Sequence, residues 1–88
     1  MKVPEHITGT WMDGLSDADL LLAEARLHKT YTALENTERK ARGEQFALMR
    51  GPAELLAAWG RWSRISAYAR GRGLHVRRTP KKVRAVAS

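Results

Sequence analysis

Apolar positions between residues 51 and 70 recur every three or four residues, the spacing that places them on one face of a helix. Pro52 suits the first helical position, where its missing N–H would have no partner inside the helix. Gly71 and Gly73 suit the end, where a left-handed residue closes the last turn. The pattern therefore predicts a helix over residues 52–70, whose apolar face consists of Leu55, Ala58, Trp59, Trp62, Ile65 and Ala69.

A second periodic stretch lies upstream and contains no proline from residue 17 to residue 50. Ser16 can cap its exposed amides, and acidic residues follow in the first turn. Leu20, Leu27 and Leu34 fall seven residues apart, as in a coiled coil. The second seam position is poor, however, because Ala23, Thr30, Thr37 and Glu44 occupy it. We therefore expect one side of a helical hairpin rather than an extended coiled coil.

Gly43 interrupts the polar middle of this stretch, because glycine costs about 1 kcal/mol relative to alanine inside a helix. It marks either a kink or the end of one helix before a shorter one over residues 44–50. Two i,i+4 ion pairs favour a helix that persists to about residue 42. We expect a continuous, bent helix over residues 17–49, supported by the pairs Glu35–Arg39 and Glu38–Arg42.

The connection between the two helices is short, which requires them to be antiparallel neighbours. The sequence thus predicts an all-α fold, an antiparallel helical hairpin in which a long helix packs on a shorter one. Phe46, Leu48 and Met49 are expected to close the connected end. The apolar stripe near residues 20–22 needs cover from residues 1–15, from residues 74–76 or from another subunit. The facing side chains are expected to be Leu20, Leu27, Tyr31 and Leu34 against Leu55, Trp59, Trp62 and Ile65.

The two ends of the chain lack helical periodicity. Residues 1–15 are predicted to be irregular because a proline and two glycines interrupt them. Trp11 within them either covers the core or anchors a partner. Residues 77–88 combine Pro80 with dense like charge, which favours an extended arm that becomes ordered on binding. The expected organisation is a single domain over residues 1–76 followed by this basic arm.

The net charge of +7 is concentrated toward the C-terminus, where residues 71–88 carry six basic residues and no acidic one. Arginine and lysine neutralise phosphates and release counterions, so such a region favours nucleic acid. A solvated helix face with a solubilising tail remains the alternative. No helix-turn-helix pattern is present, because the first helix is too long. The candidate nucleic-acid-binding residues are Arg61, Arg64, Arg70 and Arg72 in the second helix and Arg77, Arg78, Lys81, Lys82 and Arg84 in the arm.

Large aromatic side chains are the candidates for protein contact. Trp59 and Trp62 lie on the apolar face of the second helix, where they either form the core or remain half exposed and clamp a partner. Together with Trp11 they are the predicted partner-binding residues. A chain of 88 residues buries only about 60–65% of its unfolded surface, so a protein partner or self-association is expected.

Catalytic chemistry has no support in the sequence. The absence of cysteine excludes disulfides, thiolate metal sites and cysteine nucleophiles. The three histidines, His6, His28 and His75, are far apart and lack metal-ligand spacing. Acidic residues such as Glu24, Glu35 and Glu38 are spaced like the charges of a solvated helix. We expect no enzyme activity, no cofactor, no metal and no small-molecule substrate.

No apolar run approaches the roughly 20 residues that span a bilayer. The first residues also lack the apolar region of a signal peptide, so we expect a cytoplasmic protein, or part of a complex assembled there, without membrane contact. The hypothesis is a non-enzymatic assembly or accessory protein whose helical hairpin docks on a protein partner or on itself. Its basic arm would contact nucleic acid or an acidic surface, and a small structural component of a phage particle is one fitting example. The alternative is a free-standing DNA-binding accessory or regulatory protein.

Overall fold

The computed structural model describes residues 2–74, which are mostly helical and contain no strand. The all-α prediction is therefore confirmed for this part of the chain. Three α-helices are joined in part by two short 3₁₀ turns. They are α1 (Gly9–Asp13), α2 (Asp17–Arg42), η1 (Gly43–Gln45), η2 (Leu48–Arg50) and α3 (Ala53–Gly71).

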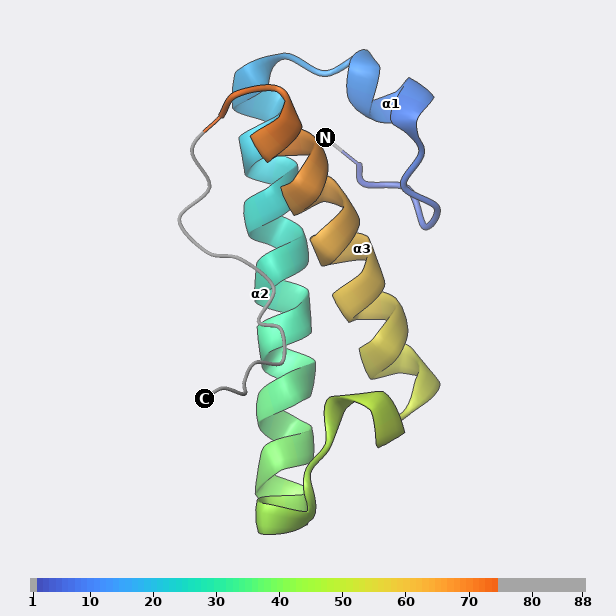
Figure 1. Cartoon of the computed structure of the whole chain (residues 1–88), viewed down its shortest axis with the longest axis vertical. Helices are drawn as coiled ribbons and strands as arrows, with labels where there is room; N and C mark the ends of the chain where they lie inside the picture. The colour runs from blue at the N-terminus through green and yellow to red at the C-terminus, as the bar shows by residue number, and fades with distance from the viewer. Residues whose placement is uncertain (1, 75–88) are drawn as a thin grey trace.

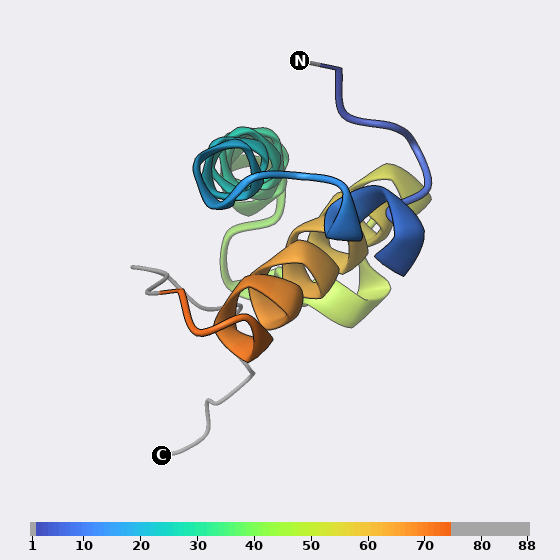
Figure 2. The ribbon, with the colours of Figure 1, turned by 90° about the horizontal axis from the view of Figure 1, so that it is seen from above.

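The two long helices contact each other and run in opposite directions (Figure 1). Seen from above, α3 crosses α2 at an angle, and α1 lies beside α3 (Figure 2). The start of α2, the end of α3 and α1 thus share one end of the molecule. The 3₁₀ turns occupy the other end.

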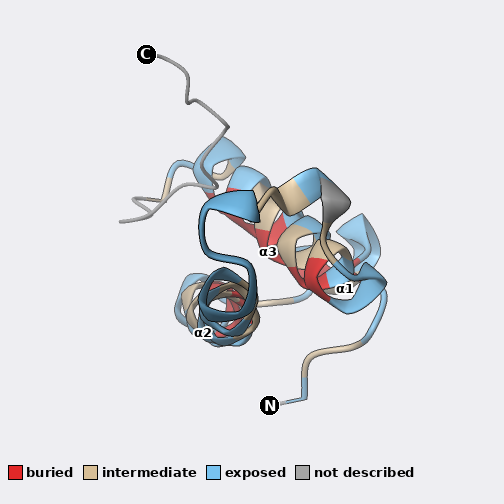
Figure 3. Ribbon diagram, turned by 90° about the horizontal axis from the view of Figure 1, so that it is seen from below, coloured by how far each residue is buried: buried red, intermediate tan, exposed pale blue. Residues whose placement is uncertain are grey.

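The core lies between α2 and α3 and is completed by two residues of the N-terminal segment, Ile7 and Met12. Figure 3 shows the buried stretches along the two long helices. Leu34 and Trp59 are only partly buried, whereas Ala23 and Ala69 are fully buried. The buried hydrophobic residues of the long helices are Leu20, Ala23, Leu27 and Tyr31 of α2 and Leu55, Ala58, Trp62, Ile65 and Ala69 of α3.

Helix α2 begins where the sequence predicts and ends earlier. The Ser16 hydroxyl caps its first turn by accepting a hydrogen bond from the Asp19 amide at 3.1 Å. The prediction of a continuous helix to Met49 is wrong, because α2 stops at Arg42. Gly43 there adopts φ +56°, a conformation that glycine tolerates and that does not continue a right-handed helix.

The last turns of α2 carry both predicted ion pairs. Arg39 contacts Glu35 at 3.1 Å, and Arg42 contacts Glu38 at 2.7 Å. The guanidinium of Arg39 also lies 4.4 Å from the ring centre of Phe46. These contacts keep the helix regular up to the glycine that ends it.

Helix α3 agrees with the prediction to within one residue at each end. Pro52 is its N-cap, and Gly73 follows its C-cap with φ +92°. The Gly73 amide bonds to the Arg70 carbonyl and the Leu74 amide to the Ala69 carbonyl, each at 3.0 Å. This is a Schellman motif, the helix ending that glycine favours.

Two further expectations are corrected. Residues 1–15 are not wholly irregular, because Thr8 caps α1 by accepting a hydrogen bond from the Trp11 amide. Met49 does not close the connected end, since it is 73% exposed, whereas Phe46 and Leu48 do pack against the core. The predicted basic arm, residues 77–88, lies outside the described residues.

Candidate nucleic-acid and partner interface

Trp62 lies inside the helix pair and is only 3% exposed. Its Nε1–H donates a hydrogen bond to the Glu24 Oε2 atom at 2.8 Å. Its ring stacks on Tyr31 with 5.2 Å between ring centres, and His28 meets it edge-on at 4.7 Å. A partner would reach this side chain only if the core opened, so in the closed fold Trp62 acts as a core residue.

Glu24 is the polar residue whose burial the sequence analysis did not predict. It was expected on a solvated surface, yet it is 4% exposed. It follows Leu20 by four residues and precedes Leu27 by three, so the helical period places it on the apolar stripe. That position, together with the need of a buried tryptophan N–H for an acceptor, is the signal that could have revealed the pair.

Tyr31, in the same interior, has a raised pKa. The Tyr31 hydroxyl donates a hydrogen bond to Glu35 Oε2 at 3.1 Å. Burial first, and then the negative charge of Glu35, raise the pKa of Tyr31 to about 12. The phenol therefore stays protonated at neutral pH and acts as a donor within α2.

The other two candidate tryptophans have a different environment. Trp11 in α1 and Trp59 in α3 are both partly buried and pack against the core. Trp11 thus covers the core, as one of its two predicted roles requires.

Arg61 projects from α3 toward the N-terminal segment, where its Nη2 donates a hydrogen bond to the Pro4 carbonyl at 2.8 Å. Within the described residues its buried Nε has no hydrogen-bond partner. Arg64, one turn further along α3, is exposed. Both arginines line a groove of about 590 Å³ between residues 5–7 and the two long helices.

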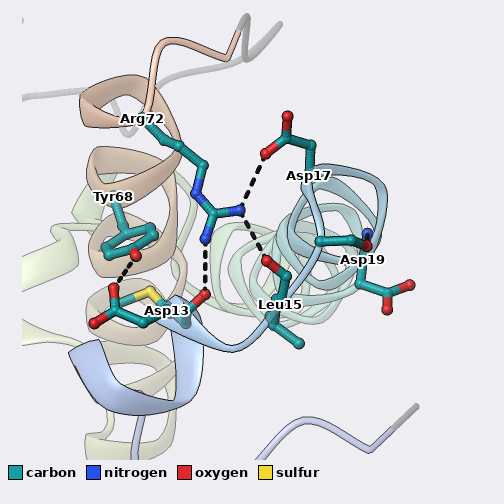
Figure 4. Close-up of polar contacts among 8 residues, drawn as sticks. Asp13, Leu15, Asp17, Asp19, Tyr68 and Arg72 are labelled. Carbon is teal, nitrogen blue, oxygen red and sulfur yellow. Dashed lines mark hydrogen bonds and ion pairs between the residues drawn. The ribbon is translucent and has the colours of Figure 1, made fainter.

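Arg72 links the end of α3 to the segment that connects α1 and α2 (Figure 4). Its Nη1 donates to the Leu15 carbonyl at 2.9 Å and to Asp17 at 3.1 Å. Its Nη2 donates to the Met12 carbonyl at 3.0 Å. Arg72, a predicted nucleic-acid-binding residue, therefore uses these donors within the protein itself.

Tyr68 contributes to the same junction. Its hydroxyl donates a hydrogen bond to the Asp13 carboxylate (Figure 4), and its ring lies 5.3 Å from the Arg72 guanidinium. Tyr68 and Arg72 together hold α1 against the last turns of α3. The sequence places both on one side of the helix but contains no signal for their partners, which are 55 or more residues away.

The three arginines of α3 and its C-cap Arg72 do not form one patch. Arg70 is exposed and donates to the Ser66 hydroxyl at 3.0 Å. It lies six positions after Arg64, which places the two side chains about 120° apart around the helix axis. The structure thus brings Arg61 and Arg64 to one groove, and it leaves Arg70 and Arg72 elsewhere. The remaining candidates, Arg77, Arg78, Lys81, Lys82 and Arg84, lie outside the described residues.

Neither a metal-binding group nor a membrane-spanning helix is found in residues 2–74. No group of three histidine, aspartate or glutamate side chains there has a metal-binding arrangement, and none of the helices is long and apolar enough to cross a bilayer. Comparison with family models, with curated proteins and with solved structures finds no match to this chain.

Proposed function

We propose that this protein is a non-enzymatic assembly or accessory protein. In this proposal the helix pair docks, as a hairpin, on a protein partner or on a second copy of the chain. Basic residues of α3 and of residues 77–84 contact nucleic acid or an acidic protein surface. The observation that carries the proposal is that Arg61 and Arg64 line one groove just ahead of a C-terminal stretch with six basic residues and no acidic one.

Nucleic acid is the polyanion that this arrangement favours. Two guanidiniums one helical turn apart suit phosphates that succeed each other along a backbone. A basic segment further along the chain adds affinity without reading the base sequence. A small component of a phage particle or of another nucleoprotein complex would use both features.

Docking on a protein is supported by the aromatic side chains. Trp11 and Trp59 keep part of their rings at the surface, and tryptophan is enriched among residues that dominate binding energy at interfaces. The chain is also short enough that added burial in a complex would contribute substantially to its stability.

The first experiment measures binding of the purified full chain to duplex DNA over a series of salt concentrations. Each phosphate contact adds about 0.9 to the slope of log affinity against log salt. Arg64→Gln is expected to lower that slope by about 1, while Lys29→Gln on α2 is the matched control and leaves it unchanged. Replacing the five basic residues of the arm by glutamine is expected to lower it by about 4.

Solution mass on the same nuclease-treated samples separates the two hypotheses. A mass above one chain that Trp59→Ala returns to one chain supports assembly. One chain in solution with tight DNA binding supports the alternative, a free-standing DNA-binding accessory or regulatory protein. Absence of DNA binding near physiological salt, with binding to polyglutamate, assigns the basic residues to an acidic protein surface instead.

A further inference from the structure

The N-terminal segment, residues 2–14, lies against α3 and is here called the strap. Ile7 and Met12 anchor it in the core, where they are 5% and 3% exposed. Its second half, α1, is held by the Tyr68 and Arg72 hydrogen bonds described above. Its first half, residues 2–7, is linked to α3 by the hydrogen bond from Arg61 to the Pro4 carbonyl.

The first half of the strap borders two hollows. The groove of about 590 Å³ borders Glu5, His6 and Ile7. A second hollow of about 540 Å³ borders residues 2–5 and Trp11. Arg61 lines both hollows, so residues 2–7 and this arginine share two open spaces.

The donors of Arg61 are incompletely used in this arrangement. Nε–H and Nη2–H form one edge of the guanidinium, the edge that grips a phosphate or carboxylate with two parallel hydrogen bonds. Here Nη2 binds a neutral carbonyl, and Nε, which is buried, has no partner among the described residues. A phosphate would satisfy both donors with charge-assisted bonds, which are roughly twice as strong as neutral ones.

The closed strap opposes such binding in two ways. The Pro4 carbonyl occupies Nη2 and Nε is buried, so a phosphate cannot bind both donors unless this part of the chain moves. Glu5 also lines the groove together with Arg61 and Arg64, and a negative charge there repels a phosphate. Movement of residues 2–7 away from α3 removes both obstacles at once.

We propose that residues 2–7 are an autoinhibitory latch, and that a nucleic-acid phosphate displaces the Pro4 carbonyl from Arg61. The inference rests on the proposed contact of this protein with nucleic acid and adds its regulation. Arg64, exposed at the same groove, makes the first contact, and Arg61 becomes available when the latch lifts. Affinity is reduced by the fraction of molecules in which the latch is closed.

The test compares DNA affinities of full-length variants at fixed salt. Ile7→Ala weakens the anchor of the latch without altering an arginine and is expected to tighten binding about tenfold. Adding Arg61→Gln to Ile7→Ala is expected to remove that gain. Leu22→Ala, the deletion of an exposed apolar side chain on α2, is the control and leaves affinity unchanged.

A second variant keeps the test independent of folding defects. Glu5→Gln changes an exposed side chain and is expected to tighten binding more than Glu44→Gln, which removes an equally exposed acid from η1. In the wild-type protein, NMR signals of the Arg61 Nε–H and of the amides of residues 3–7 are expected to shift with the same apparent affinity as DNA is added.

The outcomes separate the two proposals. DNA binding that Ile7→Ala and Glu5→Gln leave at the level of their controls overturns the latch and leaves the nucleic-acid proposal standing. Binding at saturation without movement of the signals of residues 3–7 overturns it as well. Absence of DNA binding by the wild type and by both variants overturns the nucleic-acid contact of the proposed function together with the latch.

Discussion

The pair formed by Trp62 and Glu24 allows a stringent test of the core. Glu24→Leu removes the acceptor and leaves the indole N–H without its partner. Trp62→Phe keeps an aromatic ring against Tyr31 and leaves the carboxylate without this donor. The double variant removes both polar groups together, so neither is left buried alone.

The magnitudes follow from the burial of both groups, which are 3% and 4% exposed. An unsatisfied buried polar group costs about 1–3 kcal/mol, so Glu24→Leu is expected to lower the free energy of unfolding by that amount. Trp62→Phe is expected to cost about 2–4 kcal/mol, because it also leaves a charged group unsatisfied and opens a small void. The double variant is expected to be less destabilised than the sum by at least about 1 kcal/mol.

These losses are large for a chain of this size, whose total stability is expected near 4–13 kcal/mol. The measurement is urea unfolding of the four proteins at pH 7, followed by circular dichroism because the substitutions change tryptophan fluorescence. The same cycle on the surface pair Glu38–Arg42 is the comparison and should give about 0.3–0.5 kcal/mol. A coupling in the core no larger than that surface value would refute the argument from burial.

Three further predictions concern other positions. The pKa of Tyr31 is about 12 in the fold and 10.0 in the free side chain, so the free energy of unfolding should fall as pH rises from 10 toward 12. The urea midpoint of Tyr31→Phe should lack this part of the fall. Gly51→Ala should cost about 1–3 kcal/mol, since its added carbon would lie 2.8 Å from the buried leucine four residues later. Gly60→Ala meets no atom within 4 Å and should gain about 0.5–1 kcal/mol through helix propensity; thermal unfolding of both variants checks the opposite signs. Arg72→Gln should lower the urea midpoint more than Arg70→Gln, because Arg72 bonds two distant backbone carbonyls and Arg70 only a neighbouring hydroxyl.

The two long helices and most of their ends were predictable because helix signals are local. Ser16, Pro52 and Gly73 each act on the turn next to them, and their roles are visible in the residue type and its position. Gly43 is also a local signal, but it fits either a kink in a continuous helix or a helix end. The structure decides in favour of a helix end, with φ +56° at this glycine.

The candidate site was predicted less well. The basic residue types were recognised, yet the sequence could not distinguish an arginine directed to solvent from one that binds the fold. Arg64 belongs to the first kind, while Arg61 and Arg72 belong to the second. Their use depends on backbone carbonyls of the N-terminal segment, whose position no period in the sequence specifies.

By itself, then, the sequence determined the helical class, the apolar stripes, the capped helix ends and the location of the positive charge. Only the tertiary structure decided which polar groups lie inside and what they bind. Glu24 meets a partner 38 residues away, Arg61 one 57 residues away, and Arg72 one 60 residues away. Local preferences act over a few residues, whereas burial and pairing of a polar group depend on which elements meet when the core forms.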